Sequence, residues 1–279
     1  MNASFPIQNI CDTAYGVAIY RAIESERPDA LFCDRFARTL AGERGEQIMQ
    51  IGGGKSAGWL LVVRTCIIDR LILQSIEREG IDTVLNLGAG LDTRPYRLSL
   101  PPSLHWIEVD LPAILEYKQQ KLAGESPTCS LELVKLDLTD LAASHAFFTE
   151  VNARAKKVLV LTEGLVVYLT SEQVAILAIA LHRQDKFHGW ILDVISPLEL
   201  KLARKKYVRE LTAANSVQQF APEAGTNFFL TCGWEVEQFC SLLEAAHELN
   251  REPPFNWILR RFAPLKQDGI VLLKRFDRA

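Results

Sequence analysis

The 279-residue sequence has little net charge, no long apolar segment and no paired cysteines, and each absence excludes a class of protein. The formal net charge is -3, with 23% charged residues spread along the chain, so no basic field is available to hold nucleic acid. No stretch approaches the roughly 20 apolar residues that span a bilayer, and residues 1–20 lack a basic cluster followed by an apolar run. The six cysteines form no C-x-x-C pair or Cys/His cluster. We expect a cytoplasmic protein with no nucleic-acid, membrane or metal partner.

What the sequence does have is a regular alternation of strand and helix patterns from about residue 82 onward. Short runs rich in Val, Ile and Leu, separated by amphipathic stretches, are typical of a parallel sheet covered by helices on both faces. The expected strands are residues 83–87, 105–109, 131–136, 157–161 and 190–195, with closing strands at 234–239 and 269–275, as an antiparallel hairpin at the edge. The expected intervening helices are residues 111–122, a stretch around 146–155, and 171–182. This pattern predicts an α/β fold with a doubly wound, mostly parallel seven-stranded sheet of the Rossmann-like kind.

Two regions lie outside this alternation. Residues 1–80 are expected to form an N-terminal helical cap, with helices over residues 13–24, 34–40 and 59–79. Residues 197–230, charged at their start, are expected to form a helical insertion after the fifth strand. Thr170 and Gln173 predict a capping box that begins the helix at Ser171. The chain is therefore interpreted as one domain, whose core occupies residues 81–196 and is completed by 231–279.

A glycine-containing turn follows the first expected strand directly. Residues 86–94 have the sequence Asn-Leu-Gly-Ala-Gly-Leu-Asp-Thr-Arg, in which Gly88 and Gly90 allow a tight turn and a close approach of ligand to bare backbone amides. The third glycine of a dinucleotide fingerprint would fall at position 93, where the residue is Thr93. The turn therefore fits a nucleoside cofactor without a pyrophosphate better than it fits a nicotinamide dinucleotide.

Acidic residues end the next three expected strands. Asp110 follows Gly90 by 20 residues, the spacing at which a carboxylate can accept both ribose hydroxyls of a bound nucleoside. Asp137, followed by Leu138, ends the third strand, and Glu163 ends the fourth. Helix capping at Asp110 and loop capping at Asp137 are the alternative interpretations. Because open α/β sheets bind ligands at the carboxyl ends of their strands, these acids and the glycine turn indicate one site.

These motifs resemble those of the leucine carboxyl methyltransferase family, in particular its bacterial branch, which includes polyketide carboxyl methyltransferases. The similarity is carried by residues 87–98 (Leu-Gly-Ala-Gly-Leu-Asp-Thr-Arg-Pro-Tyr-Arg-Leu), 108–112 (Glu-Val-Asp-Leu-Pro) and 162–169 (Thr-Glu-Gly-Leu-Val-Val-Tyr-Leu), with further matches near residues 12–14, 26–32 and 63–65. The resemblance implies a class I fold and S-adenosylmethionine as cofactor. The implied cofactor-binding residues are Arg64 at its carboxylate, Gly88, Ala89 and Gly90 at its methionine part, Asp110 and Leu111 at the ribose, Asp137 and Leu138 at the adenine, and Glu163 near the amino group or the acceptor pocket. The lysine that eukaryotic members place at the cofactor carboxylate has no match here, and Thr13 and Tyr15 are the candidates to replace it.

The expected reaction is methyl transfer to an oxygen of a small molecule or of a peptide C-terminus. A carboxylate acceptor is ionised at neutral pH and needs no general base, whereas a hydroxyl acceptor normally needs one. None of the five histidines falls beside the glycine turn in this interpretation, which favours a carboxylate. Tyr168 and Arg94 are the residues expected to contact the acceptor. Phe220, Phe228 and Phe229 could line an apolar acceptor pocket or pack against the sheet.

Other functions are compatible with parts of the pattern. A hydroxyl O-methyltransferase of secondary metabolism and a non-catalytic interaction module that retains the fold stay open as alternatives. A nicotinamide-dependent oxidoreductase would share the glycines and Asp110 but needs the missing third glycine. Residues 52–56 (Gly-Gly-Gly-Lys-Ser) suggest a phosphate loop, but the required first glycine would fall at position 49, where the residue is Met49.

Overall fold

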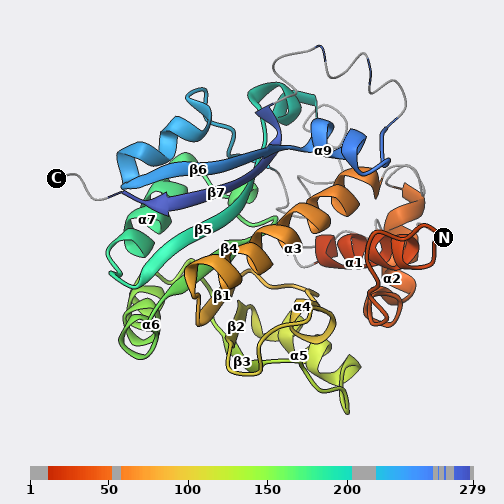
Figure 1. Cartoon of the computed structure of the whole chain (residues 1–279), viewed down its shortest axis with the longest axis horizontal. Helices are drawn as coiled ribbons and strands as arrows, with labels where there is room; N and C mark the ends of the chain where they lie inside the picture. Colours follow the sequence, from red (N-terminus) through yellow and green to blue (C-terminus); the bar gives the residue numbers. More distant parts are fainter. Residues whose placement is uncertain are drawn as a thin grey trace, which may run out of the picture.

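A computed structural model describes residues 12–51, 58–202, 218–253, 257, 261 and 267–276 of the chain. Their centre is a seven-stranded sheet with the strand order β3-β2-β1-β4-β5-β7-β6 (Figure 1). The strands are β1 Thr83–Leu87, β2 His105–Asp110, β3 Ser130–Lys135, β4 Val158–Thr162, β5 Phe187–Val194, β6 Trp234–Ser241 and β7 Gly269–Arg275. Each lies within a few residues of its expected position, because continuous apolar runs mark strands that are buried on both faces.

Strands β1 to β5 are mutually parallel, and β7 pairs antiparallel with both β5 and β6. The doubly wound, mostly parallel sheet predicted from the sequence is therefore confirmed. The predicted antiparallel hairpin at the edge is confirmed as well, because β6 and β7 pair antiparallel as the last two strands on one side of the sheet, with β7 lying between β5 and β6. The strand order reverses at β1, between β2 and β4, and such a reversal opens a crevice at the carboxyl ends of the strands.

Helices cover both faces of the sheet and one of its ends. They are α1 Asp12–Ser25, α2 Ala37–Ile51, α3 Trp59–Glu79, α4 Arg94–Arg97, α5 Pro112–Lys121, α6 Leu141–Arg154, α7 Ser171–His182 and α9 Leu242–Glu248, with the 3-10 helices η2 Val166–Tyr168 and η3 Gly225–Cys232. The predicted capping box of α7 is present, with Thr170 and Gln173 bonding to each other's backbone amides. No helix in the described ranges combines the length and apolar character needed to cross a bilayer.

One face of the sheet is covered by α3 together with α9. Ile67, Ile68 and Leu71 of α3 are almost fully buried and belong to the same cluster as Trp106 of β2 and Ile191 of β5. The sequence assigned α3 to the N-terminal cap, and the structure corrects this: the helix is a layer of the core. Its apolar side extends over the whole length of the helix, which is what packing against a sheet requires.

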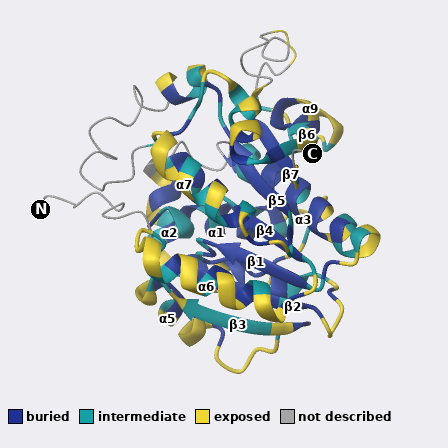
Figure 2. Cartoon of the chain, turned by 90° about the vertical axis from the view of Figure 1, so that its left-hand side faces the viewer, coloured by how far each residue is buried: buried dark blue, intermediate teal, exposed yellow. Residues whose placement is uncertain are grey.

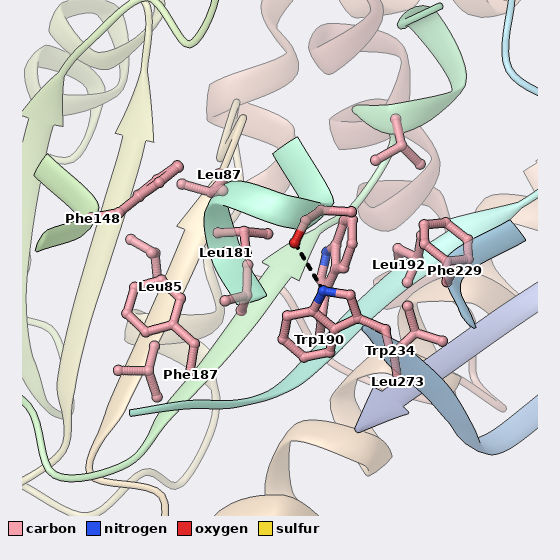
Figure 3. Close-up of a cluster of buried hydrophobic side chains, with 14 of the residues drawn as sticks. Leu85, Leu87, Phe148, Leu181, Phe187, Trp190, Leu192, Phe229, Trp234 and Leu273 are labelled. Carbon is pink, nitrogen blue, oxygen red and sulfur yellow. Dashed lines mark hydrogen bonds between the residues drawn. The ribbon is translucent and has the colours of Figure 1, made fainter. Parts of the chain in front are cut away.

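The other face is covered by α6, α7 and η3 (Figure 3). Trp190 of β5 lies edge-on to Trp234 of β6 and Phe229 of η3, at ring-centroid distances of 5.7 Å and 5.4 Å. Phe220 and Phe228 pack beside Phe229 in the same cluster, so these three phenylalanines belong to the core rather than to a free aromatic surface. Figure 2 shows the resulting layer of buried strands, with the edge strand β3 only half-buried.

Helices α1 and α2 pack on each other and form the cap proper. Their buried residues, including Ile19 and Leu40, share a cluster with Leu91 of the glycine turn and Ile114 of α5. Helix α2 is longer than the expected segment 34–40, with a kink at Gly42, whose φ is 55°. Within the expected insertion 197–230, residues 203–217 lie outside the described residues, as do residues 52–56 of the Gly-Gly-Gly-Lys-Ser segment.

Candidate functional site

The glycine turn leaves β1 at the point where the strand order reverses. Gly88 and Gly90 have φ values of 71° and 50°, in the left-handed region that favours glycine. A Cβ on Gly88 would lie 3.2 Å from Leu165 Cδ1, and one on Gly90 would lie 3.2 Å from the Cβ of Ala14 in α1. The turn is therefore closely covered, by the segment after β4 on one side and by the cap on the other.

Asp110 lies beside this turn, as the 20-residue spacing predicted. Its Oδ2 accepts a hydrogen bond from the Gly90 amide at 2.6 Å, and its Oδ1 accepts one from the Leu111 amide at 2.7 Å. Burial raises the pKa of this carboxyl, although both amide bonds oppose the shift. Asp110 thus fixes the glycine turn, and each of its oxygens has capacity to accept a further hydrogen bond. Ribose recognition by Asp110 stays a prediction.

Asp137 and Leu138 follow β3, at the same edge of the sheet. Asp137 is exposed, and its Oδ1 accepts hydrogen bonds from the amide and the hydroxyl of Thr139, which lower its pKa. Leu138 is half-buried and packs against the cluster under α6 and α7. The contacts of Asp137 are those of a loop-capping residue, and the adenine contact predicted for this pair is untested.

Arg64 projects from α3 to the ends of β4 and β5. Its Nε donates to Glu163 Oε1 at 2.9 Å, and its Nη1 donates to Asp193 Oδ2 at 3.3 Å. The residue is 8% exposed, so the positive charge is neutralised by partners rather than by solvent. The family resemblance singled out Arg64 as a contact of the cofactor's carboxylate, which stays a prediction, and the structure supplies two acidic partners for it.

Glu163 connects two arginines at the carboxyl end of β4. Its Oε2 accepts a hydrogen bond from Nη1 of Arg94 at 2.7 Å, while Oε1 binds Arg64. Burial acts to raise the pKa of Glu163, but the two guanidinium groups outweigh it and lower the pKa. Each oxygen of Glu163 thus faces one of the protein's own cations.

Arg94 was predicted to contact the acceptor, and its surroundings do not agree with that role. Arg94 is the first residue of α4, directly after the glycine turn. Its side chain is folded back toward α3, and the residue is 2% exposed. Its Nε donates to Asp69 at 2.6 Å, and its Nη1 donates to Asp92 and Glu163, each at 2.7 Å. Arg94 is therefore a positioning residue that connects the glycine turn, α3 and β4.

Tyr168, the other predicted acceptor contact, lies in η2 and is half-buried. Burial raises the pKa of its hydroxyl, and the side chain of Thr13 in α1 is its hydrogen-bonding partner. Arg64 and Asp193 are near enough to influence the same hydroxyl. The structure thus places Tyr168 between the cap and the ends of β4 and β5, and acceptor contact by this residue stays a prediction.

Sequence reasoning missed Asp193, which occupies the end of β5. Its Oδ1 accepts a hydrogen bond from the Gly164 amide at 2.6 Å, and its Oδ2 faces Arg64. The signal was available, because an acid near the carboxyl end of an apolar strand is the same pattern that singled out Asp110 and Glu163.

Asp34 was also missed. It joins the cap to the turn by accepting a hydrogen bond from the Thr93 hydroxyl at 2.6 Å.

This sheet order, with the glycine turn after β1 and an acid at the end of β2, defines the class I methyltransferase fold. The crystal structure of a candidate methyltransferase from Thermobifida fusca YX superimposes with a TM-score of 0.60, covering 99% of this chain and 97% of that chain. At 14% sequence identity, this similarity shows the fold alone.

The chain belongs to the leucine carboxyl methyltransferase family, whose model matches residues 14–181. The resemblance stated from the motifs is therefore confirmed. Among relatives, a candidate S-adenosyl-L-methionine-dependent methyltransferase from Parafrankia sp. (strain EAN1pec) is 37% identical over 58% of this chain and 55% of its own length. A similarly described protein from Streptomyces coelicolor is 34% identical over 62% of this chain and 64% of its own length. The chain thus spans slightly over half to just under two thirds of the length of these relatives.

Proposed function

We propose that this chain is an S-adenosylmethionine-dependent methyltransferase that transfers the methyl group to an oxygen, and that the acceptor oxygen belongs to a carboxylate. The observation that supports the proposal most is the pairing of the Gly88–Gly90 turn with Asp110. This pairing places the backbone of a tight turn next to the partly buried Asp110 carboxylate, whose two oxygens accept one amide hydrogen bond each and have capacity for more. A nucleoside with two ribose hydroxyls supplies further donors. The polar groups of the site therefore fit the cofactor, and the product would be S-adenosylhomocysteine.

When bound, the cofactor supplies an electrophilic methyl group on a sulfonium. An acceptor oxygen would provide the electron pair of the new C–O bond, and the sulfur would keep the pair of the broken C–S bond. The residues of the chain have to hold the reactants in line and exclude water. The cap performs the second task at the glycine turn, where Ala14 lies directly over Gly90.

The surroundings of the five histidines support a carboxylate acceptor. His105 is bonded to Glu132, His247 to Glu252 and His182 to the carbonyl of Phe276, all away from the glycine turn, and His145 and His188 lie on α6 and at the start of β5. Tyr168 does not provide a base either, because burial raises the pKa of its hydroxyl and keeps it protonated at neutral pH. A carboxylate reacts without deprotonation, so it requires no imidazole at the site.

The test uses acceptor pairs that share one scaffold and carry either a carboxylate or a hydroxyl, incubated with methyl-labelled S-adenosylmethionine. A methyl ester releases labelled methanol in mild base, whereas a methyl ether does not. We expect base-labile label from the acids only. Base-stable label from the alcohols would establish a hydroxyl O-methyltransferase. Cofactor binding without any labelled product across the panel would favour a non-catalytic module.

A further inference from the structure

A buried ion pair lies behind the β1–β2 side of the candidate site. Nζ of Lys118 in α5 donates to Oε2 of Glu108 in β2 at 2.6 Å. The side chains are 2% and 0% exposed, and Glu108 Oε1 has no hydrogen-bond partner among the residues that the structure describes. A buried pair of this kind contributes little to stability, because both ions lose their hydration. Stability therefore does not account for an ammonium at this position.

The Lys118 ammonium acts on the acid at the glycine turn. Glu108 precedes Asp110 by two residues on β2, so the two side chains share one face of the sheet. Helix α5, which carries Lys118, follows Asp110 directly in the chain. Burial raises the pKa of Asp110, whereas its two amide bonds and the positive charge of Lys118 act to lower this pKa. Lys118 is thus a cation that stabilises the ionised form of Asp110.

Glu108 holds this ammonium without cancelling its charge in mild acid. Burial raises the pKa of Glu108 to about 7, against the effect of Lys118. Below about pH 7, Glu108 therefore binds a proton, and the positive charge of Lys118 stays uncompensated at this position. The titratable groups that face Glu108 from the surrounding elements are Lys118 of α5, Asp92 of the glycine turn, Asp110 of β2, Tyr96 of α4 and Cys129 before β3. Burial raises the pKa of the Tyr96 hydroxyl to about 12 and that of the Cys129 thiol to about 11, so both are neutral in this range.

We infer that Lys118 is a positioning residue that acts through Asp110: Glu108 holds its ammonium behind the end of β2, and the ammonium keeps the Asp110 carboxylate ionised for the ribose hydroxyls. This inference rests on the proposed function. A protonated carboxyl group donates through one oxygen and loses part of its capacity to accept. Asp110 already accepts two amides, so it needs both oxygens unprotonated to accept ribose hydroxyls as well. Nucleoside binding therefore requires the charge of Lys118 rather than its ion pair with Glu108.

The experiment measures S-adenosylhomocysteine binding by calorimetry for wild type and Lys118→Met, from about pH 7 to about pH 4. Near pH 7 Asp110 is ionised in both proteins, so the two affinities should agree within about threefold. Removal of the opposite charge should raise the pKa of Asp110 by about one unit, so the ratio of wild-type to variant affinity should grow to about tenfold in acid. Titration of the ligand is the same for both proteins and cancels in this ratio.

Two further variants separate the charge of Lys118 from its contacts. Glu108→Gln keeps an oxygen for Lys118 and removes a charge that is already neutralised in acid, so its affinity ratio to wild type should stay constant below about pH 7. Glu116→Gln is the matched control, because it breaks an exposed ion pair of the same helix, with Lys135 at 2.7 Å, and it should leave the pH profile unchanged.

A ratio for Lys118→Met that does not change with pH would overturn the inference, because a purely structural residue weakens binding alike at every pH. The same acid shift in Glu108→Gln would assign the effect to the ion pair and would overturn it as well. If Lys118→Met does not fold, the double variant with Glu108→Gln decides, because it leaves no buried charge unpaired and should show the same acid shift. Wild-type protein that binds no S-adenosylhomocysteine at any pH contradicts the proposed function itself, which is a different result from binding with an unshifted profile.

Discussion

On the β1–β2 side of the candidate site, backbone amides alone hold the acid, whereas on the β4–β5 side arginine side chains bind both acids and an amide binds one of them. Asp110 is bound by the amides of Gly90 and Leu111, both within 20 residues of it in the sequence. Glu163 and Asp193 are bound by Arg64, which lies 99 and 129 residues away along the chain. One side is built from a local motif and the other from segments that meet only in the folded sheet.

The difference teaches what each side contributes. Amides at a turn are fixed by the backbone and leave a carboxylate able to accept more hydrogen bonds, which suits the recognition of hydroxyl groups. Arginines are long side chains whose geometry depends on their acidic partners, so a network of them both stabilises the fold and offers charge to a ligand. We expect the arginine side to dominate stability and the amide side to dominate nucleoside affinity.

The largest effect is expected for Arg94→Met, which removes the cation shared by Asp69, Asp92 and Glu163. Breaking a buried ion pair from one side should lower the free energy of unfolding by about 3–5 kcal/mol. Urea unfolding followed by circular dichroism measures this. Arg35→Met is the control, because the Arg35–Glu125 pair is exposed. Its loss should lower the free energy of unfolding by only about 0–1 kcal/mol. Equal losses in the two variants would mean that the network does not support the fold.

An intermediate effect is expected for Asp110→Ala on cofactor affinity. Under the proposed ribose contact, removing the partly buried Asp110 carboxylate should weaken S-adenosylhomocysteine binding by about 1–3 kcal/mol. Calorimetry measures this, with Asp137→Ala for comparison, since that side chain is exposed and bonded within its own loop. An affinity for Asp110→Ala within error of wild type would contradict the placement of the nucleoside.

The smallest effect is a difference in how Asp110 and Glu163, one acid from each side, respond to a fall in pH. Burial raises the pKa of Asp110 above 3.8, the ordinary value expected in the unfolded chain. As the pH falls toward 3.8, the folded state therefore binds a proton at Asp110 before the unfolded state does, and the free energy of unfolding rises. Burial acts to raise the pKa of Glu163, but Arg94 and Arg64 outweigh burial and lower this pKa below 4.5. The stability that ionised Glu163 contributes above pH 4.5 is therefore lost as the pH falls through the lowered pKa.

Urea unfolding of wild type, Asp110→Asn and Glu163→Gln from about pH 6 to about pH 3 tests these signs. As the pH falls, the stability of wild type relative to Asp110→Asn should rise, and relative to Glu163→Gln it should decline. Parallel trends for the two variants would contradict the opposite pKa shifts of Asp110 and Glu163.

The sequence by itself determined the elements of the sheet and the β1–β2 side of the site. Strands buried on both faces appear as apolar runs, and the glycine turn and Asp110 belong to one βαβ unit, so their proximity follows from local connectivity. The capping box of α7 was predicted for the same reason. Asp193 shows the same strand-end pattern and could have been included.

Only the tertiary structure decided which cation faces which acid, that α3 is a layer of the core, and that β7 enters the sheet between β5 and β6. Arg94 illustrates the cause, because a motif places the residue after the glycine turn but does not show the three carboxylates around it. Those partners come from α3, the turn itself and β4. They meet because the apolar faces of α3 and the strands pack together, and that packing brings charges that are distant in sequence within bonding distance.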